Sequence, residues 1–144
     1  MNPILKSLLV FVLLAAAGFA AEDFAEIKKK AEAGDADAQY NLGMKYLDGK
    51  GVPRDYTEAV NLLQSAAMQG DARAQFELGG MYNKGQGVQS SFIYAHVWWN
   101  LAAASGHQEA KSRLDYLETS MSTQSMAEAM KLARELFAKL PKGN

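Results

Sequence analysis

Two histidines are the only imidazole side chains in the sequence, which makes them the first candidates for catalysis or metal binding. His96 and His107 have no third ligand at a suitable spacing, and two imidazoles alone do not form a catalytic zinc site. The sequence also contains no Ser-x-x-Lys, Gly-x-Ser-x-Gly or His-Glu-x-x-His motif. These motifs mark common nucleophilic and zinc-dependent hydrolases. We therefore expect no catalytic residue, no bound metal and no cofactor.

Both histidines have simpler structural interpretations. His107 aligns with Asp35 and Asp71 at the start of a predicted helix, where a side-chain acceptor caps free backbone amides. His96 aligns with Val60 inside another predicted helix, so we expect it to be hydrogen-bonded or partly exposed rather than a ligand.

Two glycine pairs, Gly49/Gly51 and Gly85/Gly87, superficially resemble the glycines of phosphate-binding loops. Neither pair has a third glycine, a following Lys-Ser/Thr or a preceding strand, all of which such loops need. We interpret both as structural turns, in which glycine adopts backbone angles that other residues avoid.

Candidate binding residues lie where the sequence varies between its internal repeats. In each repeat they are four residues apart on the first helix, so they form one stripe along it. Stacked repeats would place the stripes side by side, as a mixed-charge groove for an extended peptide or a helix. An ordinary solvated surface is the alternative. The stripe residues are Asp37, Asn41 and Lys45; Arg73, Glu77 and Met81; and Glu109, Arg113 and Leu117.

Trp98 and Trp99 are the second candidate binding region, since they replace Leu62 and Leu63 of the first repeat. Adjacent residues of a helix point about 100° apart, so both rings could lie in the core. The alternative is that one ring stays partly exposed as a binding hot spot.

The elements that position these residues follow a 36-residue repeat. Residues 34–69 and 70–105 are identical at 14 of 36 aligned positions. A fixed period of this size is typical of a solenoid of stacked helical units. We call the first helix of each repeat helix A and the second helix B. Gly43 and Gly79 recur inside helix A, where glycine costs about 1 kcal/mol relative to alanine, so we expect close contact with helix B there.

The repeat frame divides the whole chain. We predict a helix over Glu22–Ala33, helix A over Ala36–Leu47 and Ala72–Asn83, helix B over Thr57–Gln69 and Phe92–Ser105, and a closing helix over Gln124–Leu140. The predicted boundaries are a signal peptide at 1–20, an N-terminal capping helix at 21–33, repeats at 34–69 and 70–105, a partial repeat at 106–121, and a C-terminal capping helix and tail at 122–144.

The first twenty residues predict a secretory signal peptide. Lys6 is their only charged residue, and Leu8 to Ala17 is an unbroken apolar run, shorter than the roughly 20 residues of a membrane span. Small residues at Gly18 and Ala20 match a signal-peptidase site. An uncleaved anchor is the alternative. We expect cleavage after Ala20 and no stable membrane insertion afterwards.

Composition narrows the range of partners. The 144 residues include 15 Lys and Arg against 16 Asp and Glu, a formal net charge of −1, so nothing indicates binding to nucleic acid. The chain has no cysteine. Disulfides and cysteine-based metal sites are therefore excluded, and packing alone must stabilise the fold.

The repeated residues resemble the Sel-1-like repeat family, relatives of the tetratricopeptide repeats, over residues 31–114. The first copy of the family pattern is Ala31, Gly34, Ala38, Gln39, Leu42, Gly43, Tyr46, Gly49, Gly51, Val52, Tyr56, Ala59, Ala66 and Ala67; the second is Ala67, Gly70, Ala74, Gln75, Leu78, Gly79, Tyr82, Gly85, Gly87, Val88, Phe92, Ala95, Ala102 and Ala103. The resemblance implies a protein-binding scaffold. A cysteine-rich secreted branch of the family is linked to β-lactam hydrolysis, but this chain lacks its cysteines.

The sequence as a whole predicts an all-α, right-handed α/α solenoid of about seven helices. We expect a non-catalytic monomer in the periplasm or outside the bacterial cell, which presents a concave helix-A groove to a partner protein or peptide. Two alternatives remain. One is a cell-envelope enzyme acting on peptidoglycan or β-lactams, and the other is an accessory subunit dedicated to a partner encoded nearby.

Overall fold

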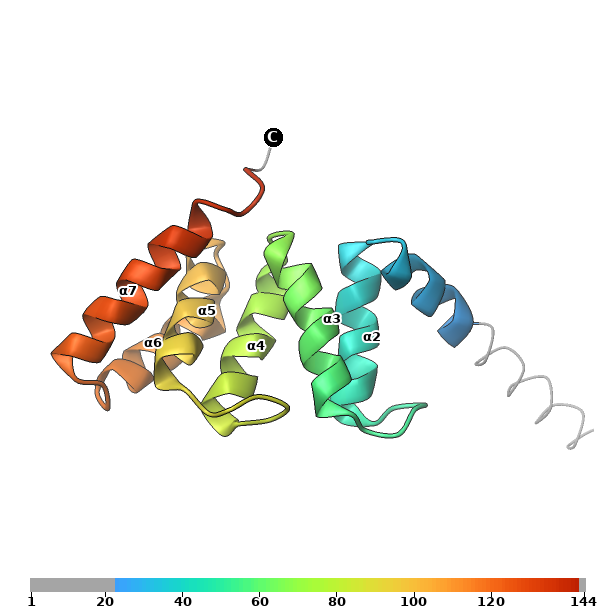
Figure 1. The fold of residues 1–144 in the computed structure, drawn as a ribbon, viewed down its shortest axis with the longest axis horizontal. Helices are drawn as coiled ribbons and strands as arrows, with labels where there is room; N and C mark the ends of the chain where they lie inside the picture. Colours follow the sequence, from blue (N-terminus) through green and yellow to red (C-terminus); the bar gives the residue numbers. More distant parts are fainter. Residues whose placement is uncertain (1–22, 143–144) are drawn as a thin grey trace, which may run out of the picture.

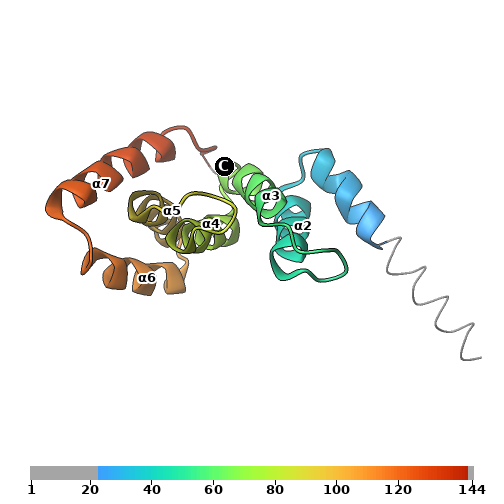
Figure 2. The ribbon, with the colours of Figure 1, turned by 60° about the horizontal axis from the view of Figure 1, so that its bottom comes forward.

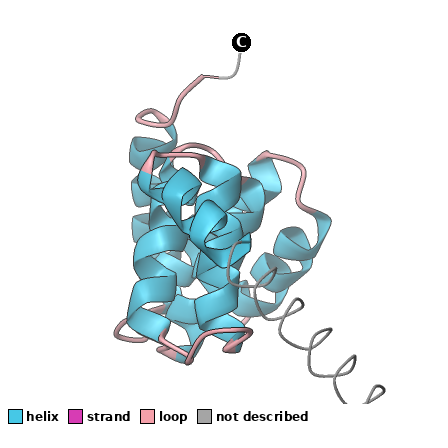
Figure 3. Ribbon diagram, turned by 90° about the vertical axis from the view of Figure 1, so that its right-hand side faces the viewer, coloured by secondary structure: helices cyan, strands magenta, loops and turns pink. Residues whose placement is uncertain are grey.

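The structure, a computed structural model, describes residues 23–142, and every regular element in this part of the chain is a helix (Figures 1 and 3). The predicted signal peptide at residues 1–20 lies outside the described residues. Successive helices stack into one row, so the predicted all-α solenoid is confirmed. The helices are residues 23–32, α2 (Ala36–Asp48), α3 (Tyr56–Met68), α4 (Ala72–Lys84), α5 (Phe92–Ala104), α6 (Gln108–Glu118) and α7 (Thr123–Phe137).

Side-chain caps fix the start of helix A in each unit. Asp35, Asp71 and His107 each accept a hydrogen bond from the amide three residues later, at 2.7, 3.2 and 3.3 Å. Each bond satisfies one of the amides that have no partner within the helix. The predicted capping role of His107 is therefore confirmed.

Helix A ends in the same way in both complete repeats. Gly49 and Gly85 follow its last residue with φ of 69°, the left-handed conformation that glycine adopts at little cost. The loop then folds back, because the amides of Asp55 and Ser91 donate to a carbonyl nine residues earlier, at 3.0 and 2.9 Å. The glycine loops are thus turns that return the chain to helix B.

Helices A and B of each repeat touch most closely at a glycine. A Cβ atom added at Gly43 would lie 2.9 Å from Cγ of Leu63, and one added at Gly79 would lie 2.3 Å from the Trp99 ring. The predicted close contact is confirmed at both positions. The missing side chains leave room for Leu63 and Trp99, which are 0% and 4% exposed.

A buried glutamine links α2 and α4 to the helix that precedes each of them. The Nε2 atoms of Gln39 and Gln75 donate to the carbonyls of Ala31 and Ala67, both at 3.1 Å. The side chain of Gln75 is completely buried. Because the bond joins residues eight apart in both copies, it fixes helix A against the end of the preceding helix.

The last helix departs from the repeat arrangement. α7 packs against α5 rather than beside α6, and the two last helices diverge (Figure 2). Ala129 and Ala133 are 0% and 3% exposed, and their small side chains let α7 approach α5 closely. The closing helix therefore covers the end of the stack without forming a third regular pair.

The predicted closing helix over Gln124–Leu140 is wrong at its C-terminal end. The helix stops at Phe137, and residues 138–140 form a turn with short-range backbone bonds. Pro141 explains the difference, because a proline disfavours the helical conformation of the residue before it.

We predict that Gly79→Ala will destabilise the protein by about 1–3 kcal/mol, the usual cost of overpacking. The Trp99 ring cannot move aside, because its Nε1 donates to the Phe76 carbonyl at 3.0 Å. Gly43→Ala should cost less, since the Leu63 side chain is more flexible. Urea unfolding measures the free energies of unfolding of Gly79→Ala, of Gly43→Ala and of the control variant Gly80→Ala.

Gly80→Ala is the matched control. A Cβ at Gly80 would meet no heavy atom within 4 Å, so this change should stabilise α4 by up to about 1 kcal/mol through helix propensity. Equal stability of Gly79→Ala and Gly80→Ala would contradict the packing account.

Candidate functional site

The predicted stripes are only partly available to a partner. Asp37, Asn41, Arg73, Glu109 and Arg113 are exposed, whereas Lys45 and Glu77 are half-buried. The remaining two, Met81 and Leu117, are 1% and 3% exposed. These two therefore cannot serve as surface contacts.

Helical geometry explains why the third position of the stripe turns inward. Residues eight apart on an α-helix point about 80° apart, because 3.6 residues complete one turn. Met81 and Leu117 consequently face helix B and pack in the core, Leu117 in a cluster with Trp99. A stripe of two residues in each helix A describes the exposed surface better.

The first residues of the α2 and α4 stripes lie side by side. The Arg73 guanidinium forms an ion pair with Asp37, which occupies the same position one repeat earlier. It also pairs with Asp71 at 2.6 Å and lies 4.4 Å from the ring centroid of Tyr40. The two carboxylates raise the pKa of Arg73 above its usual range. We call the surface formed by α2, α4 and α6 the helix-A face.

A second charge pair occupies the other end of the helix-A face. Arg113 and Glu109 are one turn apart on α6, with 3.1 Å between guanidinium nitrogen and carboxylate oxygen. Both are exposed, and such a pair contributes only about 0.2–0.5 kcal/mol to stability. A partner that offers matching charges can therefore replace it at little cost.

Glu77 is the half-buried carboxylate among the stripe residues. It forms no hydrogen bond or ion pair within the described part of the chain. Burial raises its pKa, and the carboxylates of Asp48 and Glu109 raise it further, against the opposing effect of Lys84 and Arg113. A half-buried carboxylate in this position favours a cation.

Glu77 lines a cavity of about 320 Å³ between α2 and α4, which we call the α2–α4 cavity. Residues of α4 and of the end of α2 form most of it, and the loop before α3 forms one edge. The lining residues are Met44, Leu47, Asp48, Arg54, Tyr56, Glu77, Gly80, Met81, Lys84 and Gln86.

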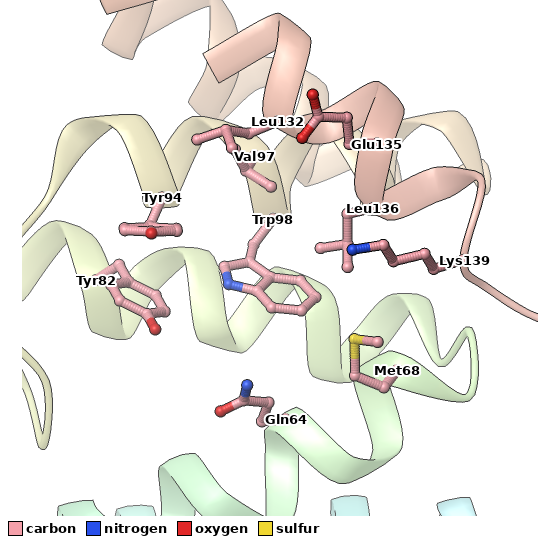
Figure 4. Close-up of a pocket in the computed structure, with 10 residues that line it drawn as sticks. All are labelled: Gln64, Met68, Tyr82, Tyr94, Val97, Trp98, Leu132, Glu135, Leu136 and Lys139. Atoms are coloured by element: carbon pink, nitrogen blue, oxygen red, sulfur yellow. The ribbon is translucent and has the colours of Figure 1, made fainter. Parts of the chain in front are cut away.

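Trp98 and Trp99 are both buried, at 5% and 4% exposure, so neither ring is an exposed hot spot. Trp99 lies against Gly79 and has a packing role. Trp98 lines a separate cavity of about 460 Å³, mostly apolar, among α3, α4, α5 and α7 (Figure 4). Tyr82 and Tyr94 lie at one side of this cavity, with their ring centroids 5.2 Å apart.

Both histidines make structural contacts. His96 is completely buried on α5, and its Nε2 lies 2.9 Å from Oε1 of Glu118 at the end of α6. His107 caps α6 and stacks on Phe76, with centroids 4.4 Å apart. Within residues 23–142 no three His, Cys, Asp or Glu side chains come together as a metal site.

Sequence reasoning missed the pair formed by His96 and Glu118. One signal was present, because Glu118 stands where Tyr46 and Tyr82 stand in the complete repeats. A carboxylate at a position of aromatic packing needs a polar partner, and His96 provides one. The pair joins α5 to α6.

The repeat pattern can be compared directly with known families. Residues 36–71 and 72–107 each match the model of the Sel1 repeat, and together these ranges make up half of the 144 residues. The chain belongs to the Sel1 repeat family. Each matched Sel1 repeat begins at the first residue of helix A, α2 or α4.

Solved structures support the same assignment. The chain is similar to c5321, a protective antigen present in uropathogenic Escherichia coli strains that displays an SLR fold, with 29% identity and a TM-score of 0.78 over 81% of this chain. It is also similar to a Sel1 repeat protein from Oxalobacter formigenes, with 42% identity and a TM-score of 0.62 over 63% of this chain. It spans only 25% and 26% of those two chains. No curated protein matches it.

We predict that Glu77→Gln will stabilise the protein near neutral pH. Because the folded-state pKa of Glu77 is raised, its ionised form destabilises the native state above that pKa, and protonation removes this penalty as the pH falls. The gain in stability from Glu77→Gln should therefore shrink as the pH approaches 4.5, the ordinary pKa of a glutamate side chain.

Thermal unfolding of both proteins over a pH series measures this difference. Glu128→Gln on α7 is the matched control, since Glu128 is exposed. A gain from Glu77→Gln that stays constant with pH would show that ionisation of Glu77 is not its cause.

Proposed function

We propose that this Sel1 repeat protein is a non-catalytic scaffold that binds a partner protein or peptide on its helix-A face. The observation that supports this proposal best is the ion pair between Asp37 and Arg73, which joins residues at the same stripe position of adjacent repeats. Within helix A, the residues that recur in both repeats, such as Gly79 and Gln75, are buried or half-buried instead. The exposed positions of helix A are therefore those that differ between the repeats.

The exposed stripe residues suit this role because they contribute little to the fold. Asn41 is exposed, and Arg113 contacts only Glu109 among its charged neighbours. Surface changes of this kind usually alter stability by no more than about 0.5 kcal/mol. Their identity can therefore vary with the partner while the helical scaffold stays unchanged.

Charge reversal tests the proposed face. A partner is first captured from envelope extract with residues 21–144, and its affinity is then measured by titration. We predict that Glu77→Lys combined with Arg113→Glu weakens binding at least tenfold, about 1.4 kcal/mol. The double variant should still unfold in a single cooperative thermal transition, which shows that the scaffold remains folded.

Glu58→Lys combined with Lys131→Glu is the matched control, with the same change in charge on exposed positions of α3 and α7. The control should bind normally. If the control loses affinity and the helix-A variant keeps it, the binding face lies on the helix-B side, and the cavity beside Trp98 becomes the candidate.

We further propose that the protein is exported to the periplasm or beyond. Lys6, the apolar run from Leu8 to Ala17 and the small residues Gly18 and Ala20 support this proposal, and similarity to a protective antigen agrees with it. In the described residues, none of the helices has both the length and the apolar character to cross a membrane.

Export predicts a mature chain that begins at Ala21. Intact mass spectrometry of protein recovered from the periplasmic and extracellular fractions checks this directly. A dominant species that retains Met1 in those fractions would contradict cleavage after Ala20.

A further inference from the structure

We propose that the α2–α4 cavity receives a lysine or arginine side chain from an extended segment of the partner, with Glu77 as its counter-charge. This inference rests on the proposed binding role of the helix-A face and adds a chemical class of ligand to it. The cavity lies between the first helices of two successive repeats, so a segment that fills it must run across both.

The walls of the cavity fit the two parts of a long basic side chain. Met44 and Leu47, both half-buried, supply apolar surface, which suits an aliphatic stem that is buried while its charged head reaches a polar site. Glu77 and Asp48 supply carboxylates. The volume of about 320 Å³ is at the lower end of the roughly 300–1,000 Å³ of ligand sites, and a single side chain needs no more.

Two cations, Arg54 and Lys84, also line the cavity. Arg54 donates to the Asp48 carbonyl at 3.4 Å and to the Tyr56 hydroxyl at 3.5 Å. The Asp48 carboxylate pairs with Lys50 at 3.1 Å. Lys84 is exposed and forms no ion pair within the described residues. Glu77 therefore remains the one cavity carboxylate whose charge no bonded cation balances.

Electrostatics select a cation over an anion at this position. Burial and the carboxylates of Asp48 and Glu109 together raise the pKa of Glu77, and Lys84 and Arg113 offset them only in part. An incoming ammonium or guanidinium group would stabilise the ionised carboxylate. An incoming carboxylate beside Glu77 would meet a like charge, which is unfavourable.

The surrounding surface favours a peptide segment as the source of the cation. Gln86 lines the cavity, and Asn41 is exposed nearby on α2 of the same face. Side-chain amides both donate and accept hydrogen bonds, so they can pair with a peptide backbone. The ion pairs of Asp37 with Arg73 and of Glu109 with Arg113 lie on the two sides of Glu77 and provide further polar contacts.

NMR titration with three short probes tests the inference. The probes are blocked pentapeptides that differ only at the central residue, which is arginine, glutamine or glutamate. With the arginine peptide we expect saturable chemical-shift changes of the Glu77 and Gly80 amides. The glutamine peptide should bind at least tenfold more weakly, and the glutamate peptide should not bind. Equal binding of all three, or no binding of the arginine peptide, would overturn the inference.

Two variants separate charge from space. Glu77→Gln should weaken binding of the arginine peptide at least tenfold. Gly80→Leu keeps every charge but places a side chain in the cavity, where a Cβ meets no heavy atom within 4 Å, so it should block the peptide without unfolding the protein. Glu109→Gln, outside the cavity, is the control and should bind normally. Full binding by Gly80→Leu would overturn the inference.

The captured partner distinguishes failure of this inference from failure of the proposed function. If Arg113→Glu weakens binding of the partner but Gly80→Leu does not, the helix-A face binds the partner and the cavity inference is wrong. If neither change affects the partner, the proposed face is wrong, and the cavity inference falls with it. Loss of affinity in both variants, with Glu109→Gln unaffected, supports both.

Discussion

Close contact between the two helices of each repeat is the constraint on which the rest of this structure depends. Gly43 and Gly79 have no side chain at the points of helix A where Leu63 and Trp99 of helix B must fit. Without cysteine, the chain has no covalent bond to hold the pair together. Dense packing at these glycines therefore sets the spacing of helices within a repeat, and the stacking of repeats follows from it.

That constraint also determines which residues are free to bind a partner. Helix A turns its glycine side toward helix B, and the Gln75 side chain holds it to the preceding turn through the Ala67 carbonyl. The opposite side of helix A does not pack against helix B, so its residues can vary between repeats. Glu77 lies at the border between these two sides. It is close enough to the core to lose part of its hydration, yet it remains reachable through the α2–α4 cavity.

The sequence predicts the parts of this molecule that depend on local periodicity. The repeat period, the caps at Asp35 and His107 and the glycine contacts follow from spacing within one helix pair. Burial of Met81 could also be predicted, because it lies eight residues after Arg73, and that step rotates it by about 80° around the helix. The cavities, the pair of His96 with Glu118 and the placement of α7 on α5 depend on contacts between separate units, for which a single sequence has no periodic signal.

A double-mutant cycle between Gly79 and Trp99 tests the central packing claim most directly. The cycle compares unfolding free energies of Gly79→Ala, Trp99→Leu and the double variant, since leucine is the residue that faces glycine in the first repeat. If overlap of the new Cβ with the ring causes the damage, the double variant should be more stable than the sum of the single effects predicts, by at least about 1 kcal/mol. Additivity within about 0.5 kcal/mol would contradict the claim that this contact sets the repeat.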